Sequence, residues 1–89
     1  MRGMTRKEQL KEIPYPVEFG ESPKDKRRYA FALALAEHWQ TVPKTREEAE
    51  AMIPSLPRHL KWAYDRGDIQ WSMVEYLQGK LRAMEAEDR

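Results

Sequence analysis

Helical spacing of apolar residues is clearest in residues 22–40, which read SPKDKRRYAFALALAEHWQ. Ser22 is a favourable N-cap, Pro23 suits the first helical position, and Asp25 has the spacing of a capping-box carboxylate. A proline shortly after this stretch, Pro43, is typical of a helix end. The stretch therefore predicts the longest and best-marked helix of the chain.

The apolar face of this helix covers roughly 200° of its circumference, wider than the stripe of an ordinary surface helix. A face this wide needs cover from more than one side, so we expect the helix to be the central element of the core. Leu33, Leu35 and Trp39 are expected to be largely buried. Ala30 and Ala34 lie outside the apolar face, where they either face solvent or receive another backbone.

Two further helices are predicted at residues 57–66 and 69–85. Ser55 can cap the first of them. Gly67 is expected to end it with a positive φ, and Asp68 then caps the second. The expected core positions are Leu56, Leu60, Ala63 and Tyr64 in the first, and Ile69, Met73, Val74, Leu77, Leu81 and Met84 in the second, with Tyr76 at its edge.

Capping boxes mark two shorter helices near the N-terminus and in the middle of the chain. Thr5, three residues before a glutamate, favours a helix over residues 6–12. A frayed basic tail fits this first segment equally well. Thr45, which also precedes a glutamate by three residues, opens a short acidic helix from residue 46 to residue 52 or 53.

Residues 13–20 read IPYPVEFG, with two prolines at alternate positions that favour an extended backbone. An extended segment would lay Ile13, Tyr15, Val17 and Phe19 across the helices as a strap. A β-strand is the alternative, but the rest of the sequence predicts no second strand to pair with it.

Together these patterns predict an all-α fold: a small helical bundle of three main helices plus a short helix and an extended N-terminal strap. Residues 1–21 are assigned to a basic N-terminal tail and the strap, and residues 22–89 to the helical bundle domain. Eighty-nine residues make one domain with a small core, so the expected stability is marginal.

Charge and cysteine content narrow the classes of ligand. Sixteen basic and fifteen acidic residues give a formal net charge of +1, which by itself does not indicate nucleic acid binding. The chain has no cysteine, which excludes disulfides, cysteine zinc fingers and iron–sulfur clusters and fits the cytoplasm. No apolar run is long enough to span a bilayer, and the N-terminus has no signal-peptide stretch, so no membrane partner is expected.

Catalytic and metal-binding patterns are missing from the sequence, so the chain is not predicted to be an enzyme. The two histidines, His38 and His59, lie on different predicted helices, and no residue pair has metal-ligand spacing. The four glycines are scattered and form no phosphate-binding loop. A serine–histidine pair that meets only in space stays open. No metal and no cofactor are expected.

Two tryptophans fall outside the predicted core faces. Trp62 lies between two arginines at helical spacing, and Trp71 lies on the polar side of the last helix. Tryptophan and arginine are enriched at protein–protein hot spots, and arginine beside tryptophan also makes cation–π contacts. In the alternative, the strap or the short acidic helix covers both rings. The predicted partner-binding surface consists of Trp62, Trp71, Arg58, Arg66, Arg82 and Gln78.

The two helices around Gly67 also resemble the helix-turn-helix family, because Ala63 precedes that glycine by four residues. In that family the small residue lets the helices cross closely, and the glycine takes the turn. Charged residues flank the glycine here where the family usually has apolar ones, and the next helix begins with carboxylates instead of cations. The resemblance implies a DNA-binding regulator that uses helices 57–66 and 69–85. Its nucleic-acid contacts would include Lys24, Lys26, Arg27, Arg28, His59 and Lys61.

Small residues form a stripe along the last helix, away from its apolar face: Ser72, Gly79, Ala83 and Ala86. A glycine inside a helix costs roughly 1 kcal/mol relative to alanine, so it is tolerated best where another backbone comes close. We expect close packing within the monomer, against Ala30 and Ala34. A homodimer in which two copies of the helix meet across a two-fold axis is the alternative.

The sequence therefore predicts a non-enzymatic module that binds another macromolecule, and it favours a protein partner over nucleic acid. Small, cysteine-free, single-domain chains commonly act as cytoplasmic adaptors, inhibitors or regulatory proteins, including phage-encoded ones. DNA binding through the helix-turn-helix pair is the alternative.

Overall fold

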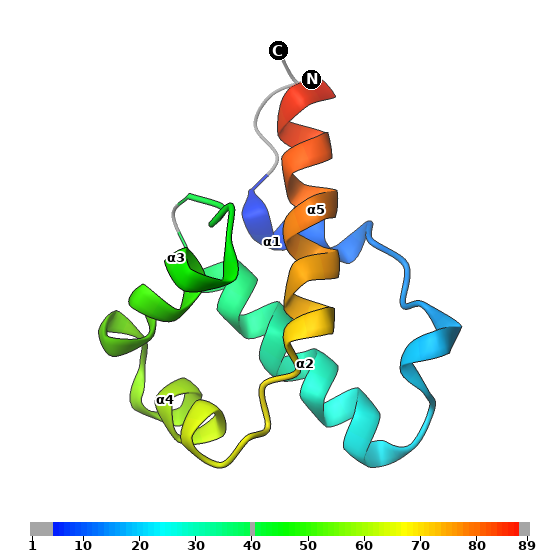
Figure 1. Ribbon diagram of the computed structural model, residues 1–89. Coiled ribbons are helices and arrows are strands. Elements are labelled where there is room, and N and C mark those ends of the chain that lie inside the picture. Colours follow the sequence, from blue (N-terminus) through cyan, green and yellow to red (C-terminus); the bar gives the residue numbers. More distant parts are fainter. Residues whose placement is uncertain (1–4, 40, 88–89) are drawn as a thin grey trace.

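The computed structural model describes residues 5–39 and 41–87, and this part of the chain is all-α, without a β-strand (Figure 1). Its five α-helices are α1 Arg6–Lys11, α2 Pro23–His38, α3 Arg46–Ala51, α4 Arg58–Asp65 and α5 Trp71–Glu87. Two 3₁₀ turns, η1 Val17–Phe19 and η2 Ile53–Ser55, lie in the connections. The predicted fold class is confirmed. Residues 1–4 of the predicted basic tail and residues 88–89 lie outside the described residues.

Helix α2 is the element on which the other long helices pack. α5 crosses it, and this pair forms the centre of the fold (Figure 1). α1 packs against both α2 and α5, whereas α4 packs on α2. α3 lies to one side and leads through η2 into α4. The central position of α2 agrees with its prediction from the apolar pattern.

The core faces of α4 and α5 are those predicted from helical spacing. Leu77 and Leu81 of α5 and Leu60 of α4 are among the largest fully buried side chains. Tyr64 and Tyr76 pack against this core with part of their surface exposed, as does Met84. The remaining predicted core residues are buried as well: Leu56, Ala63, Ile69, Met73 and Val74.

The buried face of α2 is narrower than predicted and leaves Leu33 at its edge. Leu35 is 0% exposed and Trp39 is 5% exposed, as expected. Leu33 is only partly buried, because it lines a shallow notch between α1 and α2 together with Leu10. With only six residues, α1 is too short to cover this flank of α2. The buried residues of α2 itself are Tyr29, Ala32, Leu35 and Ala36.

The ends of α2 follow its capping residues. The Ser22 hydroxyl accepts a hydrogen bond from the Asp25 N–H at 3.1 Å, as predicted. The Asp25 carboxylate accepts from the Ser22 hydroxyl at 2.8 Å and not from the backbone N–H of a full capping box. The helix ends at His38, since Trp39 takes an extended conformation with φ −72° and ψ 136°. Residue 40, the predicted last residue, lies outside the described residues.

Both short helices predicted from capping boxes are present. At the start of α1 the Glu8 N–H donates to the Thr5 hydroxyl at 3.2 Å, and the Thr5 N–H donates to the Glu8 carboxylate at 2.9 Å. Thr45 caps α3 by accepting from the Glu48 N–H at 3.1 Å. The Glu48 carboxylate accepts from the Lys44 N–H, so the bonds are reciprocal only at α1. At both helices they satisfy backbone donors that a helix start leaves free.

Gly67 ends α4 with φ +79°, which confirms the predicted left-handed turn. The Asp68 N–H donates to the Ala63 carbonyl at 2.8 Å, and the Gly67 N–H donates to the Tyr64 carbonyl at 3.1 Å. These two bonds form a Schellman motif, which satisfies the last carbonyls of the helix. α4 and α5 are therefore separate helices, as predicted.

Two residues predicted as N-caps have other roles. Ser55 lies in η2, where its hydroxyl donates to the Met52 carbonyl at 2.8 Å, so α4 begins without a side-chain cap. Asp68 pairs with Arg66 at 3.1 Å and is separated from α5 by two non-helical residues. α5 begins at Trp71, because the Schellman motif is followed by a short extended connection.

The strap is extended only up to Pro16. The 3₁₀ turn η1 then ends the alternation of side chains on which the prediction depended. Ile13 is buried and Phe19 is partly buried, as is Tyr15, but Val17 is 76% exposed and its predicted packing is wrong. Because the described residues contain no strand, the strand alternative is wrong as well.

An aromatic cluster of Tyr15, Phe19, Tyr29 and Tyr76 anchors the strap to α2 and α5. The rings of Tyr15 and Tyr29 meet edge to face with centroids 4.7 Å apart, and those of Phe19 and Tyr76 do so at 5.6 Å. The Tyr76 hydroxyl donates to the Pro14 carbonyl at 2.7 Å. The strap therefore covers the flank formed by α2 and α5.

Tyr29→Phe is expected to raise the free energy of unfolding by about 1 kcal/mol at neutral pH, because the buried Tyr29 hydroxyl has no hydrogen-bond partner. Burial raises the pKa of Tyr29 above its ordinary value, and the nearby Tyr76 and Tyr15 raise it further. The unfolded chain therefore releases this proton more readily than the folded protein does. Stability of the parent should fall as the pH rises above about 10.

The Tyr29→Phe variant has no hydroxyl to ionise at this position. The difference in free energy of unfolding between the variant and the parent should therefore widen as the pH rises. Urea unfolding from about pH 8 to about pH 11 measures both stabilities. An advantage that stays constant over this range would mean that the Tyr29 hydroxyl is not shielded from water.

The stripe of small residues on α5 faces solvent. The prediction that Gly79 packs against Ala30 or Ala34 within the monomer is wrong. α5 turns its apolar face to α2, and the stripe lies on another side of the helix. A Cβ atom added to Gly79 would meet no atom within 4 Å. The homodimer alternative stays a prediction. The exposed members of the stripe are Ser72, Gly79, Ala83 and Ala86.

Gly79→Ala is therefore expected to stabilise the monomer by about 0.5–1 kcal/mol, because alanine is the better helix former and its methyl group has room. A thermal melt measures the gain, and sedimentation equilibrium of the same sample shows whether self-association changes. A lower melting temperature, or weaker self-association than the parent, would contradict the prediction and indicate a backbone packed on Gly79.

Candidate partner-binding surface

Trp62 is presented by a helix whose opposite side forms part of the core. α4 buries Leu60 and Ala63, and Trp62 is 58% exposed. Positions two residues apart on a helix point about 200° apart, so burial of Leu60 turns Trp62 outward. The alternative in which the strap or the short acidic helix covers this ring is wrong.

Polar residues surround the Trp62 ring on α4. Arg58 and Arg66 lie one turn before and one turn after it, and His59 lies three residues before it; all three are exposed. Arg66 donates to the Asp68 carboxylate through Nη2 at 3.1 Å and Nε at 3.3 Å. Within the described residues, Arg58 takes part in no ion pair. The name Trp62 surface is used below for Arg58, His59, Trp62 and Arg66.

Trp71 does not belong to the Trp62 surface, although the two tryptophans were predicted to form one patch. Its ring is partly buried and meets the Tyr64 ring edge to face at 6.3 Å, with the Arg46 guanidinium 5.2 Å from its centroid. Tyr64 and Trp62 point to different sides of α4, because they are two residues apart. Trp71 is thus covered in part by α3, which agrees with the alternative in which the short acidic helix covers the tryptophans.

The basic residues of α2 lie toward the same end of the molecule as α4, away from the last turn of α5 (Figure 1). Lys24, Lys26 and Arg27 are exposed, as is Lys61 of α4. The Lys26 ammonium lies 5.6 Å from the centroid of Tyr15 and so contacts the strap. The first turns of α2 and helix α4 nevertheless lie on opposite sides of the view in Figure 1, so the structure does not join these cations and the Trp62 surface into one patch.

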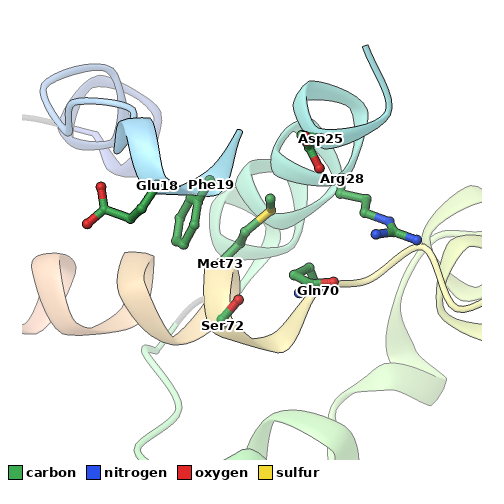
Figure 2. Close-up of a pocket in the computed structure, with 7 residues that line it drawn as sticks. All are labelled: Glu18, Phe19, Asp25, Arg28, Gln70, Ser72 and Met73. Atoms are coloured by element: carbon green, nitrogen blue, oxygen red, sulfur yellow. The ribbon is translucent and has the colours of Figure 1, made fainter. Parts of the chain in front are cut away.

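Arg28 is the basic residue of this set that lies partly inside the molecule. It lines a cavity of about 290 Å³ between η1 and the start of α5 (Figure 2). Its Nε is buried without a partner, and its guanidinium points away from Phe19 toward the chain that leads into α5. Glu18 and Asp25 line the same cavity, and their two carboxylates make it a poor site for phosphate.

Gln78 was predicted to be a surface residue, and the structure places it inside. It is 3% exposed, and its Nε2 is buried without a hydrogen-bond partner. The side of α5 that carries Gln78 was classified as polar because charged residues share it. That side packs against the rest of the fold, so Gln78 cannot contact a partner.

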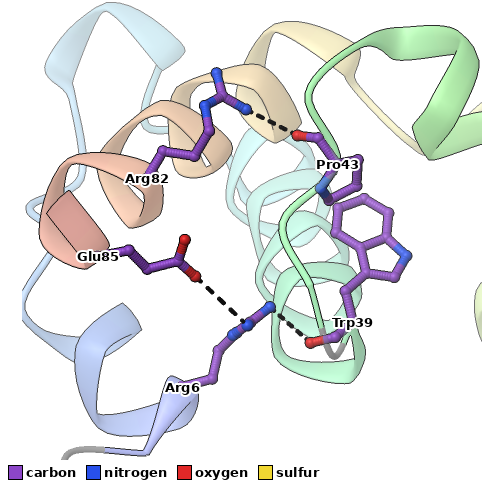
Figure 3. A network of polar contacts seen from close by, with 5 residues as sticks. All are labelled: Arg6, Trp39, Pro43, Arg82 and Glu85. Atoms are coloured by element: carbon purple, nitrogen blue, oxygen red, sulfur yellow. Dashed lines mark hydrogen bonds and ion pairs between the residues drawn. The ribbon is translucent and has the colours of Figure 1, made fainter.

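Arg82 is partly buried and holds the chain between α2 and α3. Its Nη1 donates to the Pro43 carbonyl at 2.8 Å (Figure 3). Beside it Arg6 donates to the Trp39 carbonyl at 2.6 Å and lies 3.9 Å from the Glu85 carboxylate. These contacts tie the segment after α2 to α1 and α5. Arg82 therefore has a structural role, which is the reason to remove it from the predicted surface.

The two histidines of the chain, which lie on different helices, line one groove. It has a volume of about 420 Å³ and lies between α2 and α4, beside the Trp62 surface. Sequence reasoning missed it, because only the packing of α4 on α2 brings the two side chains to the same opening. The name α2–α4 groove is used below for the space lined by Ala34, Glu37, His38, Pro57, His59 and Leu60.

In residues 5–39 and 41–87, no group of three or more histidine, aspartate or glutamate side chains is placed to hold a metal ion. No helix in the same ranges combines the length and apolar character needed to cross a membrane. Comparisons with models of protein families, with curated proteins and with solved structures found no match to this chain. The Trp62 surface is therefore the feature from which a function is inferred.

Proposed function

We propose that this chain is a non-enzymatic protein-binding module that acts through the Trp62 surface, as an adaptor, an inhibitor or a regulatory protein. The observation that carries the proposal is the 58% exposure of Trp62 on a well-formed helix. Folding gives no reason for a large apolar side chain there, because α4 already buries Leu60 and Ala63 on its other side. Tryptophan beside arginine is the composition of a binding hot spot.

The rigidity of α4 supports this role. The Schellman motif at Gly67 closes the helix, and its apolar side is fixed against α2. A tryptophan on a rigid helix loses little conformational freedom when it binds, which favours affinity. Arg66 is already oriented by Asp68, whereas Arg58 is free to pair with a carboxylate of the partner.

Nucleic acid is the second candidate partner. Exposed tryptophan and arginine also stack on bases, and the exposed Lys24 and Arg27 of α2 can contact phosphates. The helix-turn-helix geometry is less favoured, because α4 and α5 each pack on α2 and the first turn of α5 turns Trp71 toward Tyr64. A protein partner is preferred because the net charge of +1 gives little general attraction to nucleic acid.

The proposal is tested by capture of partners from a nuclease-treated lysate of the native host. The wild-type chain, Trp62→Ala and Val17→Ala are each immobilised, and the retained proteins are compared by mass spectrometry. Val17→Ala is the matched control, because Val17 is also an exposed apolar residue, 76% exposed, but lies on η1. Wild type and control should retain the same protein, and Trp62→Ala should lose it.

Retention of the same proteins by Trp62→Ala would show that the surface is not the binding site. If proteins are retained from an untreated lysate but not from the nuclease-treated one, the partner is nucleic acid. In that case binding to heparin should fall steeply with salt concentration.

A further inference from the structure

We infer that the notch between α1 and α2 binds a small organic acid, which places an apolar group between the two helices and its carboxylate beside two lysines. The name α1–α2 notch is used below for the space of about 190 Å³ lined by Lys7, Leu10, Lys11, Leu33 and Glu37. None of these residues belongs to the Trp62 surface. The inference is therefore independent of the proposed function.

The floor of the notch is apolar. α1 contributes Leu10, and α2 contributes Leu33, which stays partly exposed because α1 is too short to cover this flank. An apolar cavity of about 150 Å³ in a protein core holds one benzene molecule. The notch of about 190 Å³ therefore has room for one phenyl or branched alkyl group, which would remove part of the exposed surface of Leu33 from water.

Two lysines border this apolar floor. Lys7 and Lys11 lie four residues apart on α1, so they share the face of the helix that also carries Leu10. Lysine side chains lay their methylene stems along apolar surface and keep the ammonium group in water. Both lysines are exposed, and within the described residues neither takes part in an ion pair. Their ammonium groups are therefore available to a ligand that lies in the notch.

The charges that line the notch favour an anion. Glu37 supplies the one carboxylate of the lining, and with the two lysines it gives the lining a net charge of +1. Glu8 and Glu12 of this part of the chain do not line the notch, and the Glu8 carboxylate accepts from the Thr5 N–H. A carboxylate in the notch is attracted by both ammonium groups, whereas a cation is repelled by both.

The size of the notch decides between a small acid and a protein surface. A stable protein–protein interface uses about 20–30 residues on each side, whereas five residues line the notch. The occupant is therefore a small molecule with one apolar group and one carboxylate, such as an aryl or branched alkyl carboxylic acid. The C-terminal residue of a peptide has the same chemistry and is the alternative that the experiment distinguishes.

The experiment compares three probes that carry the same phenyl group: phenylpropionate, its amide phenylpropionamide, and phenylpropylammonium. Each is titrated into the full chain at neutral pH and low ionic strength, and binding is followed by the leucine methyl signals in carbon–proton correlation spectra. Leu33→Ala lacks the signals of that residue and so assigns them. Phenylpropionate should bind most tightly and phenylpropylammonium most weakly, and the methyl signals of Leu10 and Leu33 should shift.

Variants of the charged residues test where the carboxylate lies. Lys7→Gln and Lys11→Gln should each weaken phenylpropionate binding about threefold, the effect of one exposed ion pair, and leave phenylpropionamide binding unchanged. Glu37→Gln should strengthen phenylpropionate binding by a similar factor, because it removes a repulsion. Lys24→Gln is the matched control, since it removes an exposed lysine of α2 outside the notch. All four residues are exposed, so the fold should stay intact, and urea unfolding checks this.

Equal binding of phenylpropionate and phenylpropylammonium, or unchanged phenylpropionate binding in both lysine variants, would overturn the assignment of an anion. Methyl signals of Leu10 and Leu33 that respond to none of the probes would overturn the site itself. Tighter binding of acetyl-glycyl-phenylalanine than of phenylpropionate would show that the occupant is the C-terminus of a peptide and not a small acid. Trp62→Ala should bind phenylpropionate as the parent does, so failure of this inference leaves the proposed function intact.

Discussion

Leu35→Ala is expected to lower the free energy of unfolding by about 2–5 kcal/mol, because Leu35 is 0% exposed in the last turn of α2. α2 is the helix on which α1, α4 and α5 pack, so a cavity there weakens contacts to several elements. Small domains have a total stability of about 5–15 kcal/mol. The variant is therefore expected to be close to unfolding at ambient temperature.

Leu33→Ala is the matched control, since it makes the same chemical change two residues away on the same helix. Leu33 is only partly buried in the notch beside α1, so its removal should cost about 1 kcal/mol. Urea unfolding followed by circular dichroism measures both variants. Equal losses in the two variants would mean that α2 is rotated about its axis relative to the arrangement described here.

Local chemistry explains why most helices could be predicted from the sequence. N-caps such as Ser22 and Thr45 make hydrogen bonds to a residue three positions away, and the bonds of the turn at Gly67 span at most five residues. The apolar positions of α5 also repeat with the helical period, so its core face was predicted correctly from Met73 to Leu81. These features depend on neighbours in the chain and not on the arrangement of the helices.

The predictions that are wrong depend on distant parts of the chain. The width of the buried face of α2 depends on how far α1 extends, and this determines the exposure of Leu33. Gln78 is buried because α5 packs on that side, although the residue type and its charged neighbours indicated solvent. Val17 is exposed because η1 interrupts an extended segment that the prolines favoured only as far as Pro16.

At the candidate site, too, the correct predictions depend on local sequence and the wrong ones depend on distant parts of the chain. Outward placement of Trp62 follows from the helical phase of α4 alone, since Leu60 and Ala63 are buried. The partial burial of Trp71 required knowledge that α3 places Arg46 beside its ring. The α2–α4 groove was missed for the same reason.

Trp39→Ala is expected to lower the free energy of unfolding by about 3–5 kcal/mol, whereas Trp62→Ala should change it by about 0.5 kcal/mol or less. Trp39 is 5% exposed and lies in the core. Trp62 is 58% exposed. Urea unfolding of both variants at neutral pH provides the comparison.

Iodide quenching of tryptophan fluorescence in the parent tests the same difference without a mutation in the core. Trp39 should be shielded, Trp71 partly accessible, and Trp62 the main quenched residue, so Trp62→Ala should remove most of the quenchable fluorescence. If Trp62→Ala unfolds as easily as Trp39→Ala, and its quenching matches that of the parent, the Trp62 ring is part of the core. Folding would then explain why α4 carries a tryptophan at this position, and the reason for inferring a protein partner would be lost.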